Sequence, residues 1–247
     1  MTTPEGRCAG SLWAVYAATV PSSLPLFPLN AALVPGLVLP LHIFEPRYRR
    51  MIEELLARPE ESDREFGIIA VRDGHQTATS GLAALYEVGT TAILRGAQEY
   101  EDGRFDIVTT GNRRFRLRSI NPPSGDPTAT FMEGEVDFLD EPLCDPAPAL
   151  VAQVRRLFSQ YRALLGQQMF GEEILRPAAP DDQADLAYLV TASMVLPVAE
   201  RQRLLAALDS RARLMEARNL LVRETGLITM LSCLPALDVA SPGFCPN

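Results

Sequence analysis

The sequence contains no lysine. All 23 of its basic residues are arginines, against 31 aspartates and glutamates, so the formal net charge is −8. A nucleotide-binding P-loop, a Ser-Lys dyad and a Schiff-base site each need a lysine, and these 247 residues therefore exclude all three. The acidic balance also argues against a general binder of nucleic acids or anionic membranes, because such proteins cluster cations against phosphates.

Histidine and cysteine are scarce as well. The four cysteines form no C-x-x-C pair, and neither His42 nor His75 has a second ligand at metal-binding spacing, so we expect no metal and no cofactor. His42 ends an apolar run and is expected to be a hydrogen-bonded structural histidine. No apolar run approaches the roughly 20 residues of a membrane span. Arg7 is the only cation before the apolar run 12–20, which favours an N-terminal extension over an export signal and predicts a cytoplasmic protein with reduced cysteines.

The first half of the sequence has the pattern of short strands with one helix. Residues 24–41 are apolar but broken by prolines, which restricts those prolines to edge, end or bulge positions, with a turn at Pro35-Gly36. Pro46 opens a helix that should end before the next proline. Apolar runs and period-two alternation predict further strands over 66–71, 82–88, 91–100, 104–110, 114–119 and 131–139. The strands over 91–100 and 104–110 are expected to form a hairpin that turns at Glu101-Asp102-Gly103.

The periodicity changes after the proline-rich segment 140–148. Apolar residues at helical spacing predict four helices, the third opened by Pro197 and the last capped by Gly226, with Leu208 facing the core of the bundle. The expected organisation is an N-terminal extension over 1–23, a β subdomain over 24–140, a helical bundle over 149–232 and an irregular tail over 233–247.

Residues 24–56, which read LPLFPLNAALVPGLVLPLHIFEPRYRRMIEELL, resemble the opening of the N-terminal substrate-binding domain of Lon-type proteases. The likeness continues through FGIIAVRDG (66–74), LYEVGTTAIL (85–94), DGRFDIVTTGNRRFRLRSI (102–120) and LAYLVTASMVLPVAERQRLLAALDSRARL (186–214), and it covers roughly 24–226 in order. The resemblance implies an α+β fold, with a PUA-like twisted β pseudo-barrel followed by a C-terminal helical bundle. It also implies a role in recognising substrate polypeptide.

Lon proteases continue into an ATPase module and a Ser-Lys peptidase module, whereas this sequence stops soon after the predicted bundle and lacks lysine for either. We therefore expect a free-standing recognition module without enzymatic activity. Its expected partners are unfolded or exposed polypeptide segments, held in an apolar groove or added to the proline-blunted edge strand 24–29, and a protease or chaperone that it serves as an adaptor. The alternative is a PUA-like module that binds RNA or a small ligand.

The segment HIFEPRY, residues 42–48, is one candidate binding site. Arg47 can pair with a carboxylate or a carbonyl, and Phe44 and Tyr48 supply aromatic area. The competing interpretation is a corner between strand and helix, with Glu45 at the helix N-terminus and the aromatic rings in the core. The spacing favours this structural interpretation, because it is what a packed corner requires.

The basic segment 113–118 is the second candidate. Arg114 and Arg116 are placed to grip RNA phosphates or acidic peptide segments, with Phe115 available for stacking. Strand alternation instead puts the arginines together on a solvated face, as in any half-exposed strand. The residues assigned to peptide binding are therefore Phe44, Arg47, Tyr48, Arg114 and Arg116, and no spacing singles out a catalytic group.

Overall fold

The computed structural model describes residues 22–72, 81–121, 130–141, 146–169, 180 and 182–231. The expected tail over 233–247 lies outside these residues, as do residues 1–21 of the expected N-terminal extension. His75 also lies outside them.

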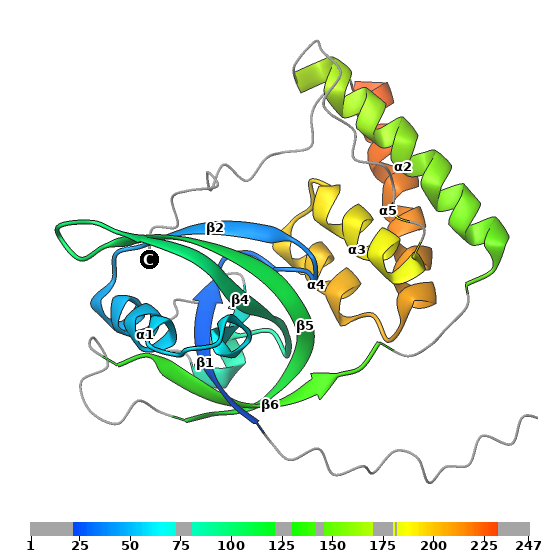
Figure 1. The fold of residues 1–247 in the computed structure, drawn as a ribbon. Coiled ribbons are helices and arrows are strands. Elements are labelled where there is room, and N and C mark those ends of the chain that lie inside the picture. Colours follow the sequence, from blue (N-terminus) through cyan, green and yellow to red (C-terminus); the bar gives the residue numbers. More distant parts are fainter. Residues whose placement is uncertain are drawn as a thin grey trace, which may run out of the picture.

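Six strands and five α-helices follow one another in the described part of the chain (Figure 1). The strands are β1 (Ser22–Leu29), β2 (Val38–Ile43), β3 (Glu65–Ala70), β4 (Val88–Glu99), β5 (Phe105–Asn121) and β6 (Met132–Leu139). The helices are α1 (Pro46–Leu56), α2 (Pro148–Met169), α3 (Gln183–Ser193), α4 (Val198–Ala206) and α5 (Ser210–Leu231). The expected α+β class, with a twisted barrel followed by a helical bundle, is confirmed.

Five of the strands close into a barrel. The strand order is β2-β5-β4-β3-β1-β6, and β5 also pairs with β6, which joins the two ends of the ring. Strand β5 can do so because it is long: on one side it pairs with β4, and on the other its first half pairs with β2 and its second half with β6. Strand β2 therefore lies outside the ring, and no strand pairs with its second side in the described part of the chain.

The expectation that 24–29 forms an edge strand is wrong. Strand β1 lies between β3, to which it is parallel, and β6, to which it is antiparallel. Its prolines are tolerated because each has a neighbour on one side only: Pro25 pairs with β6 before the β3 pairing begins, and Pro28 pairs with β3 after the β6 pairing ends. On the side where each proline has no neighbouring strand, there is no ladder hydrogen bond that its missing N–H could interrupt.

Two further strand predictions need correction. The segment expected as a strand over 82–88 begins with a 3₁₀ turn, Gly81–Ala84, and only Leu85 bridges to Val71 before β4 starts. The strands expected over 104–110 and 114–119 are one continuous strand, β5, because pairing with β4 carries it past Gly111. The hairpin between β4 and β5 turns where it was expected, with Gly103 at a φ of +77°.

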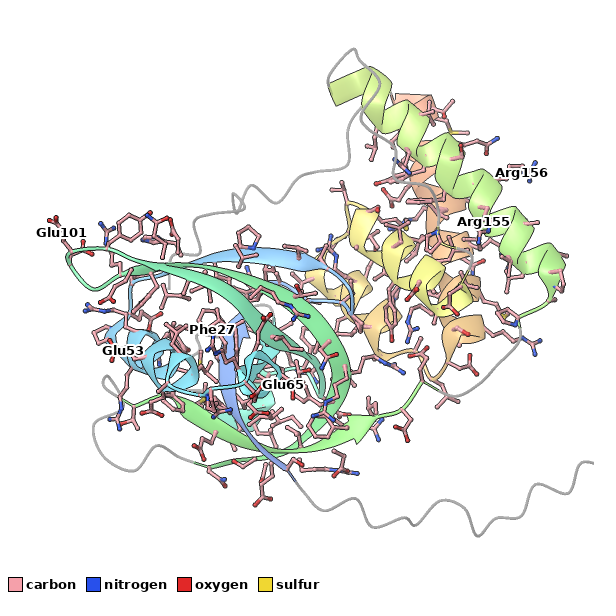
Figure 2. All side chains as sticks on the ribbon, viewed as in Figure 1. Phe27, Glu53, Glu65, Glu101, Arg155 and Arg156 are labelled. Carbon is pink, nitrogen blue, oxygen red and sulfur yellow. The ribbon has the colours of Figure 1, made fainter. Side chains whose placement is uncertain are left out.

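Helix α1 packs against the inner face of the barrel. It starts at Pro46, as predicted, because a proline suits the first turn, where its missing N–H has no helical partner. Its buried face meets Phe27, which lies inside the barrel in Figure 2, and the residues of that face are Tyr48, Met51, Ile52 and Leu55. The barrel interior and this helix therefore share one apolar core.

Helices α2 to α5 have a core of their own. It is built from residues at helical spacing, among them Val154, Tyr161 and Leu221. Two predictions about this region are wrong. Gly226 does not cap the last helix, since α5 runs on to Leu231, and Leu208 is 77% exposed because it lies in the turn between α4 and α5.

Candidate binding surface

The outer face of the barrel carries a strip of exposed apolar side chains. Alternation in β2 turns Val38 and Pro40 away from the core, and cross-strand pairing sets Val108 of β5 directly opposite Pro40. At the far end of β2, the ring of His42 lies 6.3 Å from that of Phe44 and 6.2 Å from that of Tyr100, measured between centroids. We call this surface the outer strip, and its residues are Val38, Pro40, His42, Phe44, Tyr100 and Val108.

A hydrogen-bonded group fixes the end of the outer strip near the β4–β5 hairpin. Nδ1 of His42 lies 2.6 Å from a carboxylate oxygen of Asp106, and the hydroxyl of Tyr100 donates to the other oxygen. The hydrogen bonds from Tyr100 and His42 hold the pKa of Asp106 below its ordinary value. The bond between Tyr100 and Asp106 also raises the pKa of Tyr100. His42 is thus hydrogen-bonded, as expected.

The three candidate residues of the HIFEPRY segment lie at the corner between β2 and α1, and they differ in their exposure to solvent. Arg47 pairs with Glu45 at 2.6 Å and its guanidinium lies 4.7 Å from the centre of the Tyr48 ring. Tyr48 is only 3% exposed, and the centre of its ring lies 4.4 Å from that of the Phe27 ring. This burial raises the pKa of Tyr48 to about 12. Phe44, in contrast, is 43% exposed on the outer strip. Of the three, Phe44 is the side chain most accessible to a ligand.

The arginines of β5 do not form one solvated face. Arg113 pairs with Glu65 at 3.0 Å and lies over the ring of Phe138, and Arg118 pairs with Asp137. Burial acts to raise the pKa of Glu65, but its hydrogen bonds, first among them that from Arg113, hold it below the ordinary value. Arg116 and Arg118 are exposed, as the alternation predicted for their face, and Arg113 is exposed as well.

Arg114 contradicts the prediction of a solvated face, because it is 3% exposed. Its Nη1 donates to the carbonyl oxygens of Leu205, at 3.0 Å, and Ala207, at 2.6 Å, at the C-terminal end of α4. Carbonyls at that end of a helix lack intrahelical partners and carry the negative end of the helix dipole, so they suit a cation. Arg114 therefore joins the barrel to the bundle instead of facing a ligand.

A second arginine completes this contact. Arg213 of α5 donates to the carbonyl of Leu204 and pairs with Glu141 at 2.7 Å, while Arg114 pairs with the same carboxylate at 2.9 Å. The hydroxyl of Tyr188 also donates to it. Burial acts to raise the pKa of Glu141, but its hydrogen bonds, led by that from Arg213, hold it below the ordinary value. We call these four residues, Arg114, Glu141, Tyr188 and Arg213, the junction cluster.

Sequence reasoning missed the junction cluster because its members are far apart along the chain. Arg114 reaches carbonyls 91 and 93 residues away, and main-chain carbonyls leave no signature in a sequence. The apolar residues around the cluster come from both parts too, including Val88 of β4 and Leu205 of α4. Strand alternation gave no hint, because it places Arg114 on the same face as Arg116 and Arg118, which are exposed.

Residues 23–223 match the family described as the ATP-dependent protease La (LON) substrate-binding domain. The chain belongs to this family.

Relatives of this LON substrate-binding domain include whole proteases. Lon protease 2 of Syntrophobacter fumaroxidans is 29% identical over 204 residues, which make up 79% of this chain and 24% of that protein. Lon protease of Escherichia coli K12 is 25% identical over 194 residues, or 77% of this chain and 23% of that protein. The chain thus spans about a quarter of the length of these curated relatives, and what it matches is the substrate-binding domain and not the protease domain.

Two solved structures share the fold of this LON substrate-binding domain. The Lon N-terminal domain protein from Xanthomonas campestris has a TM-score of 0.58 at 21% identity, covering 87% of this chain and 99% of that chain. The N-terminal domain of Mycobacterium avium complex Lon protease has a TM-score of 0.59 at 18% identity, covering 83% of this chain and 98% of that chain. The resemblance predicted from the sequence is confirmed.

Two features are absent from the described residues of this LON substrate-binding domain. No helix that the structure describes is long and apolar enough to cross a bilayer. No group of three or more histidine, cysteine or acidic side chains in the described ranges is arranged to hold a metal ion.

Proposed function

We propose that this LON substrate-binding domain binds exposed apolar segments of polypeptides through the outer strip. One observation carries the proposal: four large exposed apolar side chains, Val38, Phe44, Tyr100 and Val108, come from different elements and gather on one face of the barrel. Removing such groups from water on binding supplies about 25 cal/mol per Å². The family description supports polypeptide as the ligand, because the substrate of a protease is a polypeptide.

The polar groups at the hairpin end of the outer strip suit the rim of such a site. His42, Asp106 and Arg104 line its hairpin end, where they can hydrogen-bond to a polypeptide main chain without lying in the apolar centre. Polar rims around an apolar centre are the usual anatomy of protein recognition surfaces. The arginines Arg113, Arg114 and Arg118 of β5 are paired with carboxylates, which weakens the alternative of an RNA-gripping strand.

Phe44→Ala tests the proposal directly. We expect the variant to bind fluorescein-labelled, reduced and carboxymethylated α-lactalbumin about tenfold more weakly than the unaltered protein, measured by fluorescence anisotropy, because an aromatic anchor contributes about 1–2 kcal/mol. Leu208→Ala is the matched control, since this residue is as apolar and even more exposed but lies between α4 and α5. Equal losses in both variants, or no binding at tens of micromolar, would contradict the proposal.

We propose further that a polypeptide held here is destined for a protease in the cytoplasm, and that the chain has no peptidase activity itself. The support is that the relatives named above are Lon proteases, together with the absence of lysine. Labelled casein incubated with the protein alone should stay intact, and adding the protein to a purified Lon protease should change the rate of casein degradation. Cleavage of casein by the protein alone would overturn this view.

A further inference from the structure

Strand β2 has one side that the barrel does not use. It is the first strand in the order β2-β5-β4-β3-β1-β6, and its pairing with β5 is the only one it makes among the described residues. An unpaired strand side presents main-chain N–H and C=O groups in a row, and such a row is complementary to another extended main chain. The outer strip runs along the same strand, so apolar side chains accompany these groups.

The register of β2 against β5 is set by a bulge at its start. The main chain turns at Pro35 and Gly36, where Gly36 has a φ of +78°. Gly36 then donates to the carbonyl of Gly111 at 2.8 Å, while Gly111 donates to the carbonyl of Leu37 at 2.9 Å. Gly36 and Leu37 thus lie opposite the single residue Gly111. Because the first of the two is a glycine in the left-handed conformation, this is the G1 form of the β-bulge. Leu37 and Gly111 become a directly bonded pair.

This register decides which main-chain groups of β2 face the open side. Bonded and non-bonded pairs alternate along an antiparallel ladder, so after Leu37 the next bonded residues are Leu39, Leu41 and Ile43. The residues between them point their main-chain groups away from β5, and they are Val38, Pro40 and His42. These three are also the β2 residues whose side chains lie on the outer strip.

Pro40 makes the open side asymmetric. Its carbonyl can accept a hydrogen bond, but it has no N–H to donate, so the middle of the open side offers an acceptor only. Val38 and His42 on either side offer both groups. A strand that lacks one main-chain N–H donor pairs less tightly with any other strand edge. It is therefore protected from unselective pairing but can still pair with a suitable partner strand.

We propose that β2 receives an extended segment of the bound polypeptide as an additional strand, with apolar side chains at alternate residues of that segment lying on the outer strip. The proposal rests on the proposed function, because it specifies how the same ligand is held. The occupant is an extended main chain rather than a helix, because only an extended chain matches groups that recur at every second residue of β2. Its residue opposite Pro40 donates a hydrogen bond but receives none.

An N-methyl scan of a peptide ligand separates strand addition from simple side-chain contact. The probe is a short fluorescein-labelled peptide in which valine and threonine alternate, and each variant carries a methyl group on one main-chain nitrogen. We expect methylation at every second residue to weaken binding about tenfold or more, with much smaller effects between, because only alternate N–H groups face β2. Uniform small effects would overturn strand addition and leave the proposed function standing. If neither the peptide nor α-lactalbumin binds, both strand addition and the proposed function are overturned.

Two substitutions on the open side of β2 give the matched test from the protein. Pro40→Val adds an N–H there and should tighten peptide binding roughly two- to tenfold, whereas Val38→Pro removes one and should weaken it by a similar factor. Neither position bonds to β5, so both variants should keep the circular dichroism spectrum and unfolding temperature of the unaltered protein. Unchanged affinity in both folded variants would contradict the proposal. Dimerisation of the unaltered protein that peptide cannot reverse, seen by sedimentation, would assign the open side to a second copy instead.

Discussion

The barrel and the helical bundle depend on different groups for their placement. In the barrel, main-chain hydrogen bonds join each of the five ring strands to two neighbours, so the ring closes largely through its ladder. The bundle is attached by side chains. Arg114 of β5 donates to carbonyls at the end of α4, Arg213 of α5 pairs with Glu141 beyond β6, and Gln202 of α4 donates to the carbonyl of Val88 at 2.5 Å. The barrel is therefore secured by many equivalent bonds, and the position of the bundle rests on a few particular residues.

Glu141→Gln should destabilise the attachment of the bundle to the barrel, and this is the largest effect we expect. The substitution leaves Arg114 and Arg213 buried without the carboxylate they share, and removing one partner from a buried ion pair costs about 3–5 kcal/mol. Urea unfolding followed by circular dichroism measures the loss. Glu54→Gln is the matched control, because it removes a carboxylate from the exposed Arg50–Glu54 pair and should cost less than about 1 kcal/mol. Equal losses would mean that the junction cluster does not hold the bundle.

Acid should reduce the penalty of Glu141→Gln. The pKa of Glu141 is lower in the folded protein than its ordinary value of 4.5, so its contribution to stability is complete above that value and is lost as the pH falls through the folded pKa. Unfolding free energies of the two proteins, compared from about pH 7 down to about pH 3, should therefore converge. A gap that stays constant over this range would show that the charge of Glu141 is not what stabilises the junction.

Gly89→Ala should destabilise the barrel by about 1–3 kcal/mol, because the interior there has no space for a methyl group. A Cβ atom at this position would lie 2.6 Å from the carbonyl oxygen of Ile68 and would also collide with the ring of Phe115. The carbonyl belongs to the neighbouring main chain and cannot move aside easily. Thermal unfolding measures the effect, and a variant as stable as the unaltered protein would contradict this close packing.

Gly226→Ala should have the smallest effect and the opposite sign. This glycine lies inside α5, where an added Cβ would meet no atom within 4 Å, so alanine gains helix propensity of about 0.5–1 kcal/mol without a clash. The same thermal unfolding experiment should show a higher midpoint than for the unaltered protein. A lower midpoint would mean that the last turns of α5 pack more tightly than the described contacts indicate.

Local features of the sequence predicted local structure well. The start of α1 at Pro46, the turn at Pro35-Gly36 and the β4–β5 hairpin each depend on a few adjacent residues, and all three are found. The wrong predictions depend on distant partners. The central position of β1 requires β6, which follows more than a hundred residues later, and the continuation of α5 beyond Gly226 depends on the burial of Ile228 among the other helices.

The candidate site shows the same limit. The favoured interpretation of 42–48 placed both aromatic rings in the core, which is right for Tyr48 but wrong for Phe44, whose ring is 43% exposed. The burial of Arg114 could not be read from strand alternation, since alternation separates two faces but does not say which second element covers the outer one. The open side of β2 likewise follows from the strand order, which only the complete sheet defines.

The pairing of β1 with β6 has a consequence for synthesis of the protein. Ser22 pairs with Val136, so a ribosome must translate more than a hundred further codons before the first strand acquires its second neighbour. Until then, the nascent chain exposes two strand edges, one on β1 and one on the second half of β5, which are the edges that β6 later covers. The emerging barrel is itself a polypeptide with unpaired apolar strands, the kind of molecule that chaperones bind, until its last strand leaves the ribosome.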